Sequence, residues 1–398
     1  MKDTLLTACI SLRMFEWINL IVNFVFFGSK SVLSSKNKPF VCGVHAFSIP
    51  DENIEGRIFY PSKRSILSST KCTGAYWFTH AISDVVYGKL VMRLRPEFRS
   101  KFVQLVCAIA YYLCKLIPRA IMPRIPNTFT SSEIEVAKNP SMPLVIWSHG
   151  RGGNVHDHAL LLSQLAVEVP CICVCVTHTD GSADTWNNSR GHRVYFRHSK
   201  SSGQDERYLQ ETVEMQEYQI QYRIRELESV LNHLRTIKGI EFEKIVVGGF
   251  DMGGATALVA AEKLGAVGVI SLDGQFALAD RFRFPRSVFE NGRVVNVPSA
   301  FMLSDEWQVW NRAVTDNTKS LSERCPDSKL ITVKQTKHNN FIECMYWIPQ
   351  IFLIFLRLSG IIHRRAAPRK TYRRTVKWLV ALVQQYTSDE AKTRSYSS

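Results

Sequence analysis

The sequence lacks an apolar run long enough to cross a membrane. Its two longest runs, Trp17–Phe27 and Tyr346–Leu356, have eleven residues each, whereas a spanning helix needs about 20 mostly apolar residues. Asn19 and Asn23 interrupt the first run, and Pro349 interrupts the second. The N-terminal run leaves three alternatives open: a cleaved signal peptide, an interfacial or anchoring helix, or a helix packed on the domain. Lys follows the first Met, so we expect no N-myristoylation.

Motifs for metals and nucleotide cofactors are also missing. The ten cysteines form no CxxC pair, and the sequence has no HExxH, Walker loop or dinucleotide fingerprint, so we expect neither a metal nor a cofactor. Cys171, Cys173 and Cys175 alternate in the segment CICVCV, as small hydrophobic residues in a buried strand do. Unpaired thiols favour a reducing compartment. We therefore expect a cytoplasmic protein that is peripheral to membranes; the alternative is a protein secreted or anchored by its N-terminal segment.

Acidic residues are scarce near the C-terminus. The 398-residue chain has 50 Lys and Arg against 35 Asp and Glu, and from Arg357 onward it has ten basic and two acidic residues. This last tenth of the chain therefore carries +8 of the net charge of +15. A nucleic-acid-binding protein usually carries its basic face on the folded domain rather than on a tail, so we expect no nucleic-acid partner. The overall composition, 45% hydrophobic and 21% charged, is typical of a globular protein.

The basic tail has two interpretations. Apolar residues Ile351–Leu356 precede pairs of basic residues, and a helical pattern of apolar residues follows them. In the first interpretation this segment binds a membrane surface rich in anionic lipid. In the second, a C-terminal helix packs on the sheet and its basic face is solvated. The basic residues proposed for the membrane surface are Arg364, Arg365, Arg373 and Arg374, and the apolar ones are Trp378, Leu379, Leu382 and Val383.

From Met142 onward, short apolar segments alternate with helical patterns, which is typical of a mostly parallel sheet with helices on both faces. We therefore predict an α/β fold. The expected strands are 143–147, 171–176, 244–247, 267–272, 298–303 and 330–333, and 56–61 is expected to be an early antiparallel strand. A long helix before 244 is expected to bury one face consisting of Leu209, Val213, Tyr218, Tyr222, Leu227, Val230 and Leu234.

One junction between strand and helix has the pattern of a nucleophile elbow. In Gly249-Phe-Asp-Met-Gly253, a strand ends in G-x-Nuc-x-G and a helix begins, as in α/β-hydrolases. Gly249 and Gly253 suit a turn too tight for side chains, and the N–H of Met252 is expected to point at a developing oxyanion. The nucleophile position holds Asp251 instead of Ser.

Partners for this nucleophile follow in the chain order of α/β-hydrolases. Asp273 ends a predicted strand and is expected to orient the base, and His338 follows the last strand and is expected to be the general base. The N–H of Arg151, in the loop after an earlier strand, is expected to be the second oxyanion donor. Two other histidine-containing segments are expected to be structural: His149 shapes that loop, and 156–158 forms a solvated helix start.

The chain resembles the platelet-activating factor acetylhydrolase family, the calcium-independent lipoprotein-associated and type-II intracellular phospholipases. The matching segments are 57–61, 143–150, 178–183, the Arg223-containing helix, 249–254, 271–273, 304–308 and 338–341, in order over roughly residues 40–385. The resemblance implies an α/β-hydrolase domain over 39–385, between an N-terminal segment 1–38 and a polar tail 386–398. It also implies hydrolysis of short or oxidised sn-2 acyl chains of phospholipids by a metal-free triad, on a membrane or lipoprotein surface.

The carried-over triad is Asp251, Asp273 and His338, with Arg151 and Met252 as oxyanion donors. The chain departs from the family at Asp251, at Gly274-Gln275 and at Arg151. A carboxylate is a poor nucleophile toward esters and places negative charge beside the oxyanion site. Loss of a triad member costs about 10⁴–10⁶ in rate. Three interpretations stay open: a phospholipid hydrolase of strongly impaired turnover, a silent phospholipid-binding relative, and a hydrolase whose Asp nucleophile attacks an epoxide or alkyl halide.

Overall fold

A computed structural model describes most of the chain from residue 40 to residue 388. The described residues are 40–63, 74–78, 82–93, 104–105, 108–109, 111–112, 115–116, 124–125, 127–131, 134, 142–188, 190, 192–196, 206–238, 240–278, 282–289, 296–310, 312–342 and 368–388. The segment 1–38, the polar tail beyond 388, and the predicted membrane residues Arg364 and Arg365 lie outside them.

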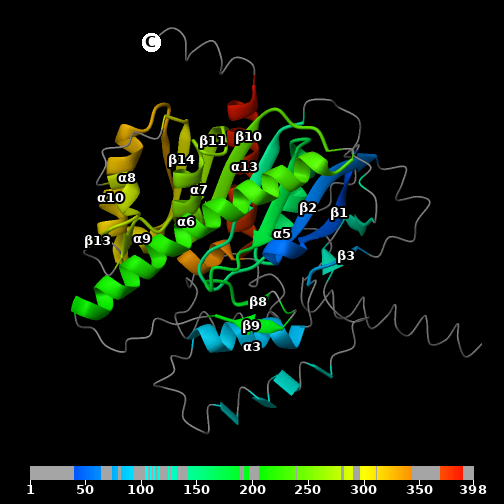
Figure 1. The fold of residues 1–398 in the computed structure, drawn as a ribbon. Coiled ribbons are helices and arrows are strands. Elements are labelled where there is room, and N and C mark those ends of the chain that lie inside the picture. Colours follow the sequence, from blue (N-terminus) through cyan, green and yellow to red (C-terminus); the bar gives the residue numbers. More distant parts are fainter. Residues whose placement is uncertain are drawn as a thin grey trace, which may run out of the picture.

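Nine strands of the described residues form one sheet (Figure 1), in the order β15-β14-β11-β10-β6-β7-β2-β1-β5. Strands β6, β7, β10, β11, β14 and β15 are mutually parallel, and the hairpin of β1 and β2 adds to β7 with β2 antiparallel. The strands are β1 (Phe40–Ile49), β2 (Ile54–Lys63), β5 (Thr128–Thr130), β6 (Leu144–Ser148), β7 (Ile172–Thr177), β10 (Ile245–Phe250), β11 (Ala266–Leu272), β14 (Ser299–Ser304) and β15 (Lys329–Val333). The predicted α/β fold with a mostly parallel sheet is confirmed.

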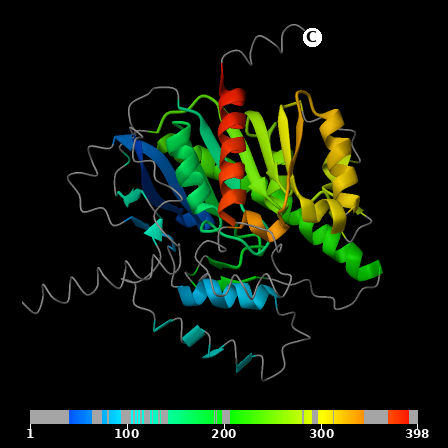
Figure 2. The ribbon, with the colours of Figure 1, turned by 180° about the vertical axis from the view of Figure 1, so that it is seen from behind.

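Helices cover both faces of this sheet. One face carries α6 (Glu206–Thr236), α7 (Met252–Ala260) and α10 (Arg312–Arg324) (Figure 1). The other carries α5 (Ala159–Glu168) and α13 (Pro368–Thr387) (Figure 2). The shorter elements are η2 (Pro50–Glu52), β3 (Ala75–Tyr76), α3 (Ile82–Arg93), β4 (Arg124–Ile125), β8 (Thr185–Asn187), β9 (Arg193–Tyr195), β12 (Ala277–Leu278), β13 (Phe282–Arg283), α8 (Arg286–Phe289), α9 (Asp305–Trp310) and η5 (His338–Phe341).

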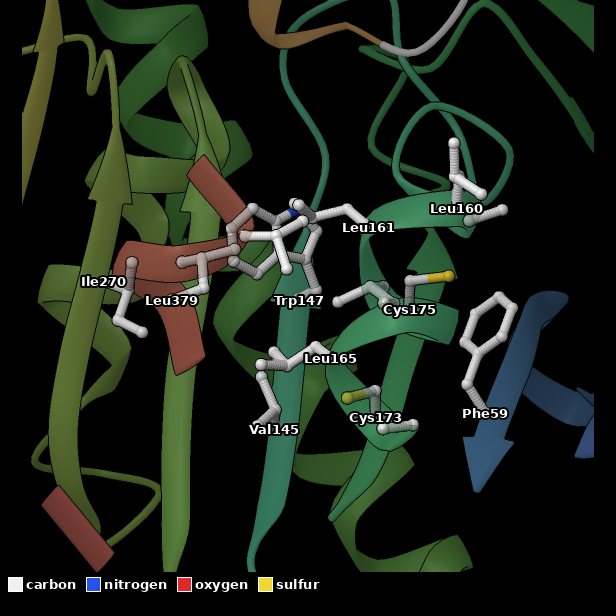
Figure 3. Close-up of a cluster of buried hydrophobic side chains, with 14 of the residues drawn as sticks. Phe59, Val145, Trp147, Leu160, Leu161, Leu165, Cys173, Cys175, Ile270 and Leu379 are labelled. Atoms are coloured by element: carbon white, nitrogen blue, oxygen red, sulfur yellow. The ribbon is translucent and has the colours of Figure 1, made fainter. Parts of the chain in front are cut away.

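The core between the sheet and α5 and α13 is apolar and contains free thiols (Figure 3). Trp147 of β6 is 1% exposed and lies among side chains of α5 and α13, including Leu165 and Leu379. Cys173 and Cys175 of β7 belong to the same cluster and are free, as expected for small hydrophobic residues in a strand.

The C-terminal helix α13 packs on the sheet. Its apolar residues Leu379, Leu382 and Val383 are at most 1% exposed, whereas Arg373, Arg374 and Trp378 are exposed. The interpretation that these three apolar residues anchor the chain in a membrane is therefore wrong, because they already fill the protein core. None of the helices in the described ranges has the length and apolar character needed to cross a bilayer.

Two local expectations are also wrong. His156 and His158 are 2% exposed instead of solvated, and the His158 ring lies 5.4 Å from Trp147 and 5.5 Å from Phe250. On α6, Val213, Leu227, Val230 and Leu234 are buried as expected, but Tyr218 is 59% exposed. The buried face of α6 includes Gln216, Gln219, Arg223 and Glu226, so its polar residues obscured the pattern on which the expectation was based.

Candidate active site

The expected elbow lies between β10 and α7. Asp251 has φ 54° and ψ −123°, a left-handed backbone conformation that non-glycine residues seldom adopt. A Cβ on Gly249 would lie 2.2 Å from the carbonyl oxygen of Gly253, and one on Gly253 would lie 2.1 Å from that of Ser148. The turn therefore excludes side chains at both glycines, as predicted. Met252 begins α7 directly after Asp251, where helical N–H groups have no intrahelical acceptor.

Asp273 and His338 lie where a triad needs them. Asp273 follows β11, is fully buried, and accepts a hydrogen bond from Ser304 N (2.6 Å). Its Oδ2 lies 3.2 Å from Nδ1 of His338. His338 Nε2 in turn lies 3.9 Å from Oδ1 of Asp251. The structure thus brings together the three residues that the sequence places far apart.

Burial and neighbouring carboxylates have opposite effects on the pKa of His338. Burial alone would lower its pKa, but the hydrogen bond to Asp273 and the charges of Asp251, Asp273 and Glu306 raise it above its ordinary value. Glu306 also accepts a hydrogen bond from the backbone N–H of His338 (2.8 Å). A histidine that keeps its proton is a weaker general base, which opposes removal of a proton from a nucleophile.

The carboxylate of Asp251 engages a predicted oxyanion donor. The N–H of Arg151 donates to Oδ2 of Asp251 at 2.9 Å. An oxyanion donor must be free to meet the substrate oxygen as that oxygen becomes negative. In this chain the donor is bound to a carboxylate belonging to the nucleophile position itself.

Trp307 is a site residue to which the sequence assigned no role, although it lies in the matching segment 304–308. Its indole Nε1 donates to Nδ1 of His338 at 2.5 Å, and the two rings are perpendicular with centroids 4.7 Å apart. Phe250 stacks on the face of the imidazole, with ring centroids 4.5 Å apart. The signal in the sequence was an aromatic residue shortly after β14, the strand that pairs with β11.

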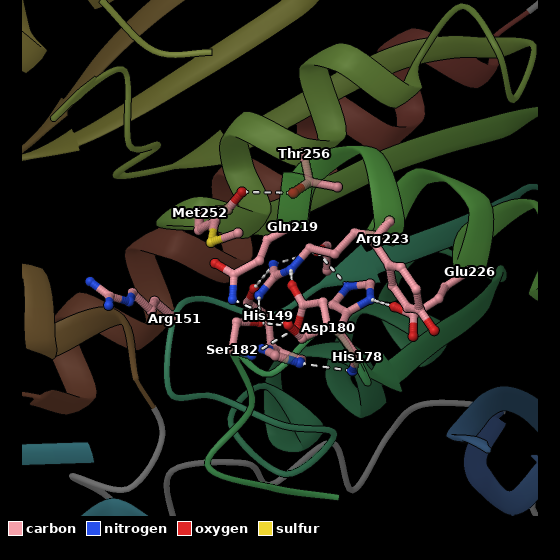
Figure 4. Close-up of polar contacts among 12 residues, drawn as sticks. His149, Arg151, His178, Asp180, Ser182, Gln219, Arg223, Glu226, Met252 and Thr256 are labelled. Carbon is pink, nitrogen blue, oxygen red and sulfur yellow. Dashed lines mark hydrogen bonds and ion pairs between the residues drawn. The ribbon is translucent and has the colours of Figure 1, made fainter. Parts of the chain in front are cut away.

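The loop that carries Arg151 is held by a buried polar network (Figure 4). Arg223 of α6 forms an ion pair with Asp180 (Nε to Oδ2, 2.9 Å), and neither side chain is exposed. It also donates to the carbonyl oxygen of His149 (2.7 Å) and to Oγ of Ser182 (2.6 Å). His149 accepts the N–H of His178 through Nε2 (3.1 Å), so its role in shaping the loop is confirmed.

A second Ser-His-carboxylate relay lies in this network. Ser148 Oγ is 2.8 Å from Nε2 of His178, and Nδ1 of His178 is 2.6 Å from Oε2 of Glu226. The distances are those of a catalytic triad, but Ser148 and His178 have no exposed surface and Glu226 has 4%. A nucleophile needs contact with substrate, so we interpret this relay as structural support for the end of β6.

Helix α3 contacts the opposite side of the same loop. Lys89 Nζ donates to the carbonyl oxygen of Gly152 (2.7 Å) and forms ion pairs with Asp157 (3.0 Å) and Asp184 (3.2 Å). The loop of Arg151 is thus fixed from α6 on one side and from α3 on the other.

The relay gives a prediction for stability against pH. Burial first, and then the charge of Asp180, raise the pKa of Glu226 to about 8. A carboxyl whose folded pKa exceeds its unfolded value contributes stability that is complete below the unfolded pKa and is lost as pH rises through about 8. We expect Glu226→Gln to remove this loss.

The test is urea unfolding of both chains at pH 5, 6.5 and 8. The wild type should be more stable relative to Glu226→Gln at pH 5 than at pH 8, and this difference in the free energy of unfolding should shrink by more than about 1 kcal/mol. Glu228→Gln, on the exposed side of α6, is the control and should show a constant difference. A constant difference for Glu226→Gln as well would contradict the raised pKa.

Within the described residues, no cluster of three or more His, Cys, Asp or Glu side chains is arranged to hold a metal ion. Asp273 and His338 lie beside the elbow in the arrangement expected of a hydrolytic triad, and the nucleophile position holds the carboxylate of Asp251.

Comparison with known proteins identifies the family. The family model described as platelet-activating factor acetylhydrolase, isoform II, matches residues 127–394, which is well over half of the chain. A search of curated proteins found no match. Among solved structures, a ferulic acid esterase from Streptomyces cinnamoneus has a TM-score of 0.60 at 15% identity, with 88% of this chain and 91% of the esterase covered. A Paleococcus ferrophilus monoacylglycerol lipase has a TM-score of 0.37 at 13% identity, covering 61% of this chain and 96% of the lipase.

The esterase likeness bears on the fold alone, because the identity is low, and the lipase likeness is too weak to support an argument. The family match spans the elbow, the acid and the histidine, and the sheet order and strand-end positions of these residues agree with it. The chain therefore belongs to the platelet-activating factor acetylhydrolase, isoform II, family and has the α/β-hydrolase fold.

Proposed function

We propose that this chain is a phospholipid hydrolase of the acetylhydrolase type, directed at short or oxidised sn-2 acyl chains, whose turnover is strongly impaired by Asp251. The observation that carries the proposal is the hydrogen bond from Arg151 N to Asp251 Oδ2 (2.9 Å). Ester hydrolysis places negative charge on the substrate oxygen at this donor. The carboxylate of Asp251 repels the negative charge on the substrate oxygen and also occupies the N–H of Arg151 that should bind this oxygen.

Phospholipid is proposed as the ligand because the family carries this activity and because Asp273 and His338 lie beside Asp251. The alternative, a phospholipid-binding protein without any catalytic activity, differs from this proposal only in that the wild-type chain would show no turnover. The experiment has two arms on the full chain: hydrolysis of a short-acyl phosphatidylcholine, and calorimetric binding of its ether-linked sn-2 analogue, which cannot be hydrolysed.

We expect saturable binding of the ether analogue, together with hydrolysis that is barely above the uncatalysed rate. Binding without any turnover favours the silent alternative. Turnover that matches a Ser enzyme, or failure to bind either lipid, would contradict the proposal.

A second candidate is favoured by how the two oxygens of Asp251 lie. Oδ2 is held by the N–H of Arg151, while Oδ1 faces His338 at 3.9 Å. This leaves Oδ1 as a nucleophile toward an sp³ carbon, so that a C–O or C–halogen bond breaks and an alkyl ester of Asp251 forms. Water would then hydrolyse that ester, a step that requires His338 to have a free lone pair on Nε2.

Isotope incorporation tests this candidate directly. A single turnover of a lipid epoxide in ¹⁸O-water should place ¹⁸O in the Asp251 carboxylate, because water attacks the ester carbonyl. Product formed without label in Asp251, or no product at all, would exclude this route.

We further propose a location in the cytoplasm, peripheral to membranes. Five buried cysteines in the described ranges are unpaired, which suits a reducing compartment. The alternative, a protein secreted or anchored by its N-terminal segment, depends on residues that lie outside the described ranges.

The surface that we propose to face the lipid is an apolar stripe of Leu105, Ile109, Tyr112 and Leu116. These side chains are 56%, 49%, 64% and 77% exposed, and their spacing is that of one helical face. From residue 98 to residue 132 the sequence has five basic residues and no acidic residue. Exposed apolar side chains within a basic segment suit a bilayer that contains anionic lipid.

Replacing part of this stripe should reduce membrane binding. Each apolar side chain that enters the interface contributes about 1.5–3 kcal/mol when fully buried. The triple variant Leu105→Gln, Ile109→Gln and Leu116→Gln should therefore bind phosphatidylcholine–phosphatidylserine vesicles at least about 10²-fold more weakly in cosedimentation.

Trp378→Gln, which removes an exposed aromatic residue of α13, is the matched control and should leave binding unchanged. Arg373→Gln with Arg374→Gln tests the predicted basic surface of α13 in low salt. Vesicle binding that is insensitive to the stripe would contradict this proposal.

A further inference from the structure

Two groups compete for one nitrogen of His338. Trp307 Nε1 lies 2.5 Å from Nδ1, and Asp273 Oδ2 lies 3.2 Å from the same atom. An indole N–H can only donate, so its contact requires a lone pair on Nδ1. The Asp273 carboxylate accepts, so its contact requires a proton on Nδ1. The two contacts therefore belong to different tautomers of His338.

We propose that Trp307 is a positioning residue that holds neutral His338 in the tautomer with its proton on Nε2. The contact with Trp307 is the shorter of the two, and it gives the indole N–H an acceptor. The proposal rests on the proposed function only in that it takes His338 to occupy the position of the general base.

Further contacts hold Trp307 and His338 in place. The Trp307 backbone is tied to its helix and to α10, since its carbonyl oxygen accepts a hydrogen bond from Thr315 Oγ1 (3.0 Å). Phe250 stacks on the imidazole with an interplanar angle of 28°, while Trp307 meets it at 90°. The backbone N–H of His338 is bound to Glu306. The imidazole is thus packed by Phe250 on its face and by Trp307 at its Nδ1 edge.

This tautomer has a consequence for catalysis. A proton on Nε2 directs an N–H toward Asp251 Oδ1, 3.9 Å away, and leaves no lone pair there to take a proton from a nucleophile. The charges of Asp251, Asp273 and Glu306 favour the imidazolium form of His338. In that form Nδ1 also carries a proton, so two N–H groups would face each other where Trp307 meets the ring. Trp307 therefore opposes both forms of His338 that carry a proton on Nδ1.

Nitrogen NMR of the full chain, labelled with ¹⁵N-histidine, tests the proposal without any substrate. His338→Gln identifies the signals by their disappearance. Above the titration of His338, we expect wild type to show an unprotonated Nδ1 and a protonated Nε2. Trp307→Phe should reverse this assignment, with Nδ1 protonated toward Asp273, and should raise the measured pKa of His338.

Two controls keep the result interpretable. Trp378→Phe, the same substitution at an exposed position of α13, should leave the His338 signals unchanged. If Trp307→Phe does not fold, site-specific replacement of Trp307 by benzothienylalanine keeps the ring shape and removes only the N–H. A protonated Nδ1 in the wild type, or a His338 spectrum unaffected by loss of the indole N–H, would overturn the proposal.

A kinetic measurement provides a second readout. An incorrect histidine tautomer costs about 10⁴ in kcat in a serine protease triad. In the Asp251→Ser background, adding Trp307→Phe should therefore raise kcat for short-acyl phosphatidylcholine by about 10²–10⁴ with little change in KM. An Asp251→Ser variant that gains nothing from Trp307→Phe, although it hydrolyses the lipid, would overturn the proposal. If neither variant hydrolyses it, the proposed substrate is wrong, and the NMR result alone decides on Trp307.

Discussion

Asp251→Ser should raise hydrolysis of short sn-2 acyl phospholipids by at least about 10²–10³. In the wild type the N–H of Arg151 binds Asp251 Oδ2, and the substitution frees it. A single oxyanion donor contributes about 10²–10³ in rate. It also supplies a hydroxyl that can form a stable acyl-enzyme, whereas a carboxylate would form a reactive mixed anhydride. The left-handed backbone at this position already suits a nucleophile elbow.

Two controls separate these effects in initial-rate measurements. Asp251→Asn removes the charge but supplies no good nucleophile, so it should stay inactive. Asp251→Ser with Asp273→Asn should lose part of the gain, because the charge of Asp273 no longer stabilises the imidazolium that forms when His338 takes a proton. If Asp251→Ser folds and binds the ether analogue but hydrolyses no more than the wild type, then the carboxylate is not what impairs turnover.

Arg223→Met should destabilise the fold by about 3–5 kcal/mol, because removal of one partner leaves the other charge of a buried ion pair uncompensated. Arg223 and Asp180 have no exposed side-chain surface. The substitution also leaves the carbonyl oxygen of His149 without the N–H that it accepts at 2.7 Å. In urea unfolding the loss should appear as a lower midpoint with an unchanged slope.

The double variant Arg223→Met with Asp180→Asn should recover part of this stability, since no unpaired charge stays buried. Arg225→Met, two residues away on the exposed side of α6, is the matched control and should change stability by less than about 0.5 kcal/mol. Equal effects of Arg223→Met and Arg225→Met would contradict the role assigned to the network.

The backbone of the site was predictable from the sequence for a simple reason. Parallel strands place their carboxyl ends at one edge of the sheet, so residues directly after β10 and β11 must meet there. Asp251, Asp273, His338 and Arg151 were located by this rule together with the glycine pattern of the elbow. The orientation of the Asp251 carboxylate was not predictable, because it depends on side-chain torsions.

Contacts between distant segments were the other limit. The buried network joins the loop after β7 to the middle of α6, and the spacing of apolar residues could not show that Arg223 and Glu226 are also buried there. In the same way, basic residues beside Leu379 suggested a membrane surface, whereas α13 packs that side chain on the sheet. Trp307 could be named as part of a matching segment, but its contact with His338 Nδ1 depends on how α9 and η5 meet.

Covalent labelling with a fluorophosphonate tests most directly the central claim that Asp251 blocks the nucleophile position and the oxyanion donor of a hydrolase site. The reagent modifies a serine only where a histidine base and an oxyanion site are assembled, and it does not depend on the natural substrate. We predict that the wild type stays unlabelled while Asp251→Ser takes up one equivalent at position 251, and does so faster when Trp307→Phe is also present, as read by mass spectrometry of the intact chain and its peptides. A folded Asp251→Ser variant that remains unlabelled would contradict the claim.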